Sequence, residues 1–111
     1  MLRIHETAVQ LIREVMPLLK EIERSDGDLA RQGRRAVTST PCNIAEGSDQ
    51  AGKRRGFHYR VALGSARETW SVLRSAAAAS YIQEPSKEMQ RKFDEVIGTL
   101  HRCIYPRPPA H

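Results

Sequence analysis

Apolar residues recur every three or four positions along most of the chain, which is the spacing of a helix that buries one face. In the first segment these positions are Ile4, Ala8, Leu11, Val15, Leu18 and Ile22. Pro17 lies among them and predicts a kink or a restart. The following run Glu23–Asp28, ERSDGD, is typical of a turn. Within it Asp26 or Asp28 could cap a second helix, because a carboxylate accepts the free N–H groups of a first turn.

A second helix is predicted by small and apolar positions after this turn. They are Leu29, Gly33, Ala36, Val37, Thr40 and Ile44. Pro41 lies inside the pattern. Because proline has no N–H and collides with the preceding turn, we expect the second helix to be interrupted at Pro41. The polar stretch Gly47–Gly56, GSDQAGKRRG, contains three glycines and predicts a flexible loop.

A long third helix is expected from about Arg55 to Tyr81. Its apolar seam is Tyr59, Leu63, Ala66, Trp70, Leu73 and Ala77. The run Glu84–Ser86 is predicted to open a fourth helix with Pro85 in its first turn, where proline is tolerated. The stripe of that helix is Met89, Phe93, Val96, Ile97, Leu100 and Ile104.

Four amphipathic helices with short connections and no strand signal predict an all-α fold, an antiparallel up-down-up-down four-helix bundle. A chain of 111 residues has room for one core only. We therefore expect a single bundle domain over residues 1–104. The remainder, residues 105–111, reads YPRPPAH and is predicted to be a flexible tail, since it cannot continue a helix.

Charge favours an anionic partner. The chain has 18 Lys and Arg against 13 Asp and Glu, a net charge of +5, which indicates nucleic acid before membrane. The alternative is an ordinary solvated surface. No apolar run approaches the length of a membrane span, and the N-terminal residues do not resemble a signal peptide. We expect a cytoplasmic protein. Cys42 and Cys103 belong to no metal-binding spacing.

The basic residues form three groups that could contact phosphates. The second helix carries Arg31, Arg34 and Arg35, and the glycine-flanked loop carries Lys53, Arg54 and Arg55. On the third helix Arg60 and Arg67 are followed by Arg74 at seven-residue intervals, so they project from one side. Such contacts would be non-specific and steeply dependent on salt. The alternative is a solvated face paired with acidic residues such as Glu68.

Two segments carry a resemblance to a known family. Residues 34–47, RRAVTSTPCNIAEG, and residues 63–68, LGSARE, resemble the four-helix-bundle proteins called 23S rRNA intervening-sequence proteins. The resemblance implies an antiparallel four-helix bundle, and several such proteins assemble into barrel-shaped pentamers. Relatives include the accessory variability proteins of diversity-generating retroelements, basic pentamers that bind nucleic acid and a reverse transcriptase. The expected partners are therefore a second copy in a homopentamer, RNA or DNA, and a protein such as a reverse transcriptase.

The polar end of the second helix has two interpretations. Asn43, Glu46 and Gly47, with Pro41 before them, could form a contact at a subunit interface or a ligand site. Alternatively, Asn43 bonds backbone groups freed at Pro41, Glu46 pairs with an arginine of a neighbouring helix, and Gly47 ends the helix as its C′ residue. Glu46 and Glu68 could also form a carboxylate pair, and a salt-bridge role for each is the simpler interpretation.

Signals for catalysis are poor. The histidines are scattered, and there is no Glu-x-x-His pair of the kind a bundle metal site uses. Ser65 lies in LGSAR and not in the G-x-S-x-G of a nucleophile elbow, and no Walker or Rossmann fingerprint occurs. We expect no enzyme, metal or cofactor. The sequence predicts an oligomeric accessory protein that binds RNA or DNA without sequence preference. The alternative is a protein-interaction scaffold with no direct nucleic-acid role.

Overall fold

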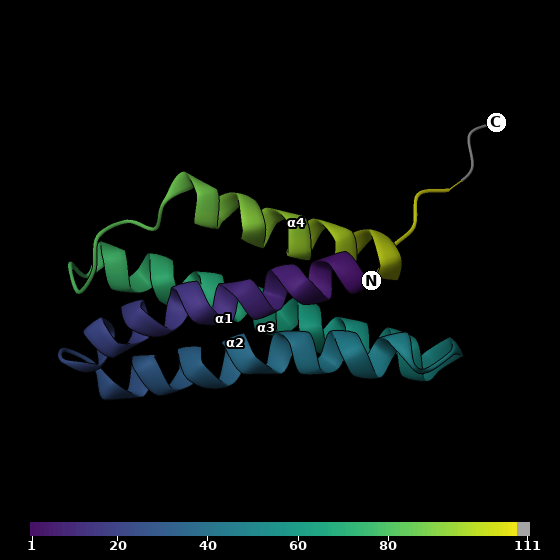
Figure 1. Cartoon of the computed structure of the whole chain (residues 1–111), viewed down its shortest axis with the longest axis horizontal. Helices are drawn as coiled ribbons and strands as arrows, with labels where there is room; N and C mark the ends of the chain where they lie inside the picture. The colour runs from purple at the N-terminus through teal and green to yellow at the C-terminus, as the bar shows by residue number, and fades with distance from the viewer. Residues whose placement is uncertain (109–111) are drawn as a thin grey trace.

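Four helices make up most of the computed structural model, which describes residues 1–108 (Figure 1). They are α1 (Leu2–Glu23), α2 (Gly27–Ser48), α3 (Gly52–Ala78) and α4 (Lys87–Ile104). Over residues 1–108 there is no strand, so the all-α prediction is confirmed. The α4 helix ends at Ile104, where the sequence predicted its last apolar position. Residues 105–108 are not helical, and the rest of the predicted tail, 109–111, lies outside the described residues.

Side-chain caps fix two of the helix starts. The Asp26 carboxylate accepts a hydrogen bond from the Leu29 N–H at 3.0 Å, which decides between the two predicted caps in favour of Asp26. The Ser86 hydroxyl accepts one from the Met89 N–H at 3.1 Å. Pro85 therefore precedes the cap and is not in the first turn of α4, contrary to the prediction. Ser86 takes the N-cap position in place of Pro85 because its hydroxyl oxygen accepts a hydrogen bond from a free backbone N–H of the first turn.

Pro41 does not interrupt α2. The helix continues without a break from Gly27 to Ser48, and Pro41 is buried within it. Proline removes one bond of the helical ladder, but Val37 and Ile44 lie in the core on either side of it. Their burial holds both halves of α2 against the same neighbours, so the helix continues. Pro17 is likewise inside an unbroken α1.

The predicted basic loop is also wrong. The connection is only residues 49–51, and α3 begins at Gly52. Gly52 has φ +62, a left-handed conformation that glycine adopts without strain. The reversal of the chain is completed there, so Lys53, Arg54 and Arg55 lie in the first turn of α3.

The helices pack as a ring in which each contacts its neighbours in chain order and α4 closes against α1. They lie along the long axis of a molecule measuring 50 × 28 × 19 Å (Figure 1). Between α2 and α3, Ser39 meets Ser65 and Asn43 meets His58, so residue numbers rise on one helix as they fall on the other. These two helices are antiparallel. Ion pairs join α4 to α1, with Lys92 Nζ at 2.6 Å from Glu14 Oε2.

The core follows the predicted stripes with small rotations. Leu19 and Ala30 are fully buried, whereas their neighbours Leu18 and Leu29 are only half-buried. Trp70 is half-buried, with its ring centroid 5.1 Å from that of the buried Phe93. Adjacent apolar residues differ by about 100° around a helix, so the neighbouring helices decide which one is buried.

Glycine permits the close approach of α2 and α3. A Cβ on Gly47 would lie 2.5 Å from two ring atoms of Tyr59, far inside contact distance. At Gly33 a Cβ would meet Val72 at 3.2 Å, with Leu19 closer still. Gly47 is thus an interior packing residue of α2 and not the predicted C′ residue, a correction that follows from the helix running on to Ser48. The cap position is Asp49.

Replacing Gly47 by alanine tests this packing. We expect Gly47→Ala to lower the free energy of unfolding by about 1–3 kcal/mol, because the added methyl forces Tyr59 out of place. Gly64→Ala is the matched control, since nothing lies within 4 Å of a Cβ there. That exposed change should raise stability by about 0.5–1 kcal/mol through helix propensity. Urea unfolding measures both, and equal effects of the two substitutions would contradict the packing role.

Candidate functional site

The net positive charge of this protein lies on α3. That helix contains six Lys or Arg residues and one carboxylate, Glu68. Its excess of five positive charges equals the net charge of the whole chain, +5. The other helices and connections together carry equal numbers of each sign. The candidate interface therefore centres on α3 and not on the surface as a whole.

Several predicted basic residues have partners within the molecule. Arg31 Nη1 lies 2.8 Å from Asp28, and Arg34 Nη1 lies 2.6 Å from Glu23. The Arg55 Nε donates to the carbonyl oxygens of Gln50 at 2.8 Å and Gly47 at 3.3 Å. Gly47 is in the last turn of α2 and Gln50 is in the connection after it, so the guanidinium lies near the negative end of the helix dipole, where a cation is stabilised. Arg55 therefore serves to join the two helices.

The other basic residues of the predicted set are exposed and, within residues 1–108, form no ion pair. They are Arg35, Lys53, Arg54, Arg60 and Arg67. Of these, Lys53, Arg60 and Arg67 are seven residues apart, so they lie on one side of α3 at intervals of about 10 Å. We call these three residues the basic stripe. Arg74 continues the spacing, but its Nε lies 3.3 Å from Glu84 and its guanidinium carbon 5.9 Å from the Trp70 ring centroid.

A row of polar side chains joins α2 to α3, on a different side of α3 from the basic stripe. Asn43 Oδ1 lies 3.1 Å from His58 Nδ1. The Asn43 amide donates to the carbonyl oxygen of Ser39 at 3.0 Å and to its hydroxyl oxygen at 3.1 Å. The Ser65 hydroxyl donates to that same Ser39 oxygen at 2.9 Å. We call Ser39, Asn43, His58 and Ser65 the polar row. Asn43 thus links two helices, whereas the prediction had it bond the backbone freed at Pro41.

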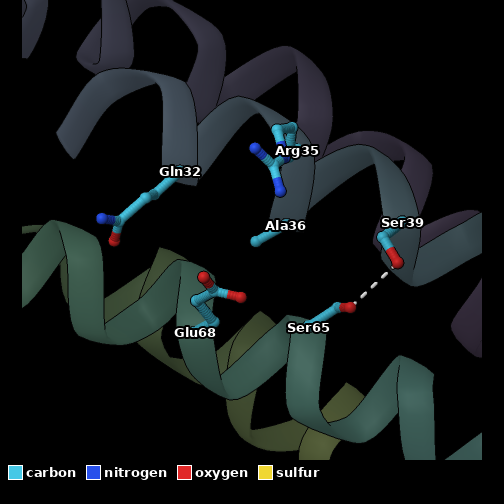
Figure 2. A pocket seen from close by; sticks show the side chains of 6 residues that line it. All are labelled: Gln32, Arg35, Ala36, Ser39, Ser65 and Glu68. Atoms are coloured by element: carbon cyan, nitrogen blue, oxygen red, sulfur yellow. Dashed lines mark hydrogen bonds between the residues drawn. The ribbon is translucent and has the colours of Figure 1, made fainter. Parts of the chain in front are cut away.

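The polar row ends at a hollow between the two helices (Figure 2). Its volume is about 300 Å³. The side chains that line it are Gln32, Arg35, Ala36 and Ser39 of α2, with Ser65 and Glu68 of α3. In Figure 2 Arg35 and Glu68 project toward one another from opposite sides, and Gln32 lies at the end away from the two serines. No ion pair within 4.0 Å joins Arg35 to Glu68 or to any other described carboxylate.

The sequence analysis missed most of this arrangement. Ser39 and Gln32 were not singled out, and His58 and Ser65 were considered only as catalytic groups. The available signal was the spacing, because Ser39 and Asn43 are one turn apart on α2 while His58 and Ser65 are two turns apart on α3. Glu46 is exposed and, among the described residues, has no ion pair with an arginine. It does not line the hollow, so the structure does not pair it with Glu68.

Over residues 1–108, no cluster of three or more His, Cys, Asp or Glu side chains is placed to hold a metal ion. None of the four helices combines the length and hydropathy that a membrane-spanning segment requires. Cys42 and Cys103 are both exposed and free.

Fold and charge together define a small four-helix protein whose net positive charge lies on α3. The model of the 23S rRNA-intervening sequence protein family matches residues 1–102. The chain belongs to that family, as the two motifs in its sequence indicated. No curated protein and no solved structure matches it significantly.

The polar row makes a prediction about stability. Asn43→Ala removes bonds to Ser39 and His58 and leaves their half-buried polar groups without this partner. We expect the free energy of unfolding to fall by about 1–2 kcal/mol.

The control for this change is Gln90→Ala on the exposed surface of α4, where no described side-chain hydrogen bond is lost. It should leave stability within about 0.5 kcal/mol of the parent. Thermal or urea unfolding checks both variants. An Asn43→Ala protein as stable as the Gln90→Ala protein would show that the row contributes nothing to stability.

Proposed function

We propose that this protein binds RNA or DNA without marked sequence preference, through the basic stripe of α3 together with Arg35 and Arg54. The observation that carries the proposal is the concentration of the entire net charge on α3. Five cations of this surface are free of carboxylate partners among the described residues. Each phosphate they meet would release counterions, which is the main source of non-specific affinity for nucleic acid.

The position of Lys53 and Arg54 supports this proposal. Both lie in the first turn of α3, which contains no acidic residue. The N-terminus of a helix carries partial positive charge, so a cation there costs roughly 0.3–1 kcal/mol. Stability alone would favour aspartate or glutamate at these positions. An anionic partner would remove the penalty, because it meets both the side chains and the positive end of the helix.

The proposal includes an assembly. We take the whole chain as an antiparallel up-down-up-down bundle, which the opposed contacts of α2 and α3 support, and as one subunit of a homopentamer, which the family resemblance suggests. Leu2 and Phe57 are 78% and 59% exposed and are available for contact between subunits. A ring would repeat the basic stripe on every subunit, and repeated weak contacts on one strand give avidity. The role is accessory, within a larger assembly in the cytoplasm.

Neutralising two arginines of the stripe tests the binding surface. We expect Arg60→Gln with Arg67→Gln to weaken binding to a twelve-residue oligouridine. The slope of log Kobs against log salt should become shallower by roughly 1.4, since each lost phosphate contact on a single strand contributes about 0.7. Fluorescence anisotropy across a salt series measures affinity and slope together.

The matched control is Arg13→Gln with Arg91→Gln, which removes the same charge from exposed positions on α1 and α4. It should retain the parent slope. Equal losses in the two double variants would contradict a localised surface and leave only a general charge effect. No binding by the parent protein at low salt, with a protein partner co-purifying in fixed ratio, would favour the interaction scaffold instead.

A further inference from the structure

We propose that the hollow between α2 and α3 receives a guanine base, from a strand or from a free nucleotide. Glu68 would accept hydrogen bonds from the N1–H and N2–H₂ groups of guanine, and Arg35 would meet a phosphate. This inference rests on the proposed function and adds a base preference to it. The expected preference is modest, because the hollow is open to solvent.

Glu68 is a negatively charged residue on a helix that we propose binds phosphates, so its presence there needs a separate explanation. It is the single carboxylate of α3, it follows Arg67 directly, and it is exposed. No described cation lies within 4.0 Å of its oxygens. A carboxylate in this position repels phosphate and accepts hydrogen bonds only. Its natural complement is a ligand that presents donors to Glu68 while its phosphate meets Arg35.

Guanine fits a carboxylate better than the other bases do. Its Watson–Crick edge presents two adjacent donors, N1–H and N2–H₂, which match the two oxygens of one carboxylate. Uracil presents one N–H between two carbonyl acceptors. Adenine and cytosine each present one amino donor beside a ring nitrogen that accepts. Proteins recognise unstacked bases through hydrogen bonds to this edge, so a guanine in a strand can bind Glu68 in the hollow in the same way as a free nucleotide.

The size of the hollow agrees with this ligand. The hollow has a volume of about 300 Å³, many times that of a site for one water molecule. At about 30 Å³ per water, this volume holds roughly ten water-sized groups. That number is comparable to the number of heavy atoms in a purine base. The buried Ala36 forms part of its lining, and this small side chain leaves the space open. A larger residue at this position would fill it.

Two further polar side chains of the hollow, Ser39 and Gln32, are available to bind the O6 atom of guanine. Ser39 Oγ accepts from Asn43 and Ser65, so its own O–H is a donor at the edge of the hollow. The Gln32 amide lies at the opposite end (Figure 2). Either can donate to the O6 atom of guanine. The guanidinium of Arg35 stands across from Glu68, where it can meet the phosphate or lie against the face of the base.

The test compares oligouridine with the same strand carrying one central guanosine. We expect the parent protein to bind the guanosine strand about fivefold more tightly, the lower end of what a bidentate base contact supplies. Inosine, which lacks the N2 amino group, should give a smaller preference. Glu68→Gln should abolish the preference while binding oligouridine at least as well, since it removes a negative charge. Glu46→Gln is the matched control, an exposed carboxylate on α2 outside the hollow, and it should keep the preference.

The outcomes separate this inference from the proposed function. Binding of both strands with equal affinity overturns the guanine site and leaves non-specific binding in place. A preference that survives in Glu68→Gln overturns the assignment to the hollow. If oligouridine does not bind, the proposed function fails, and titration with GMP and UMP then decides the hollow alone. Amide NMR shifts at Ser39 and Ser65 caused by GMP but not UMP support the site, and their absence overturns it.

Discussion

The close approach of α2 to α3 is the constraint on which the rest of this structure depends. A Cβ on Gly47 would overlap the Tyr59 ring, and a Cβ on Gly33 would lie only 3.2 Å from Val72. Backbones that approach so closely bring short polar side chains within hydrogen-bonding distance across the interface. Ser39 and Ser65 can then meet directly, which longer side chains at a wider spacing could not do. The polar row is thus a consequence of the glycines.

The close approach of α2 to α3 also determines where the charged side chains of α3 lie. Because α2 ends where α3 begins, the carbonyl groups at the end of α2 lie beside the first turn of α3, and Arg55 reaches them. The neighbouring Lys53 and Arg54 remain exposed at a helix end where cations are unfavourable. The inner faces of α3 are occupied by the core and by α2. Lys53, Arg60 and Arg67 therefore project outward as a stripe, while Glu68 is the one charged residue of α3 that lines the hollow. In the proposals made above, the stripe supplies non-specific affinity and the hollow supplies base recognition.

Membership of the 23S rRNA-intervening sequence protein family agrees with the helical architecture. The chemistry proposed here comes from the residues of this chain. In that proposal the exposed arginines attract any strand, and the carboxylate of Glu68 favours one base. The two features can be changed separately, because Arg60 and Arg67 do not line the hollow.

The sequence by itself determined the number of helices and most of their buried positions, and it limited the cap of α2 to Asp26 or Asp28, because the three-to-four spacing and a short side-chain cap are local properties. It also placed the arginines on one side of the third helix. Tertiary structure decided what lies between helices. Because Val37 and Ile44 are buried on either side of Pro41, α2 continues through the proline, and residues 49–51 with Gly52 reverse the chain where a longer loop was expected. The polar row and the hollow depend on residues more than twenty positions apart, such as Ser39 and Ser65. Their meeting depends on how α2 and α3 are rotated and spaced, and packing against the other helices sets both.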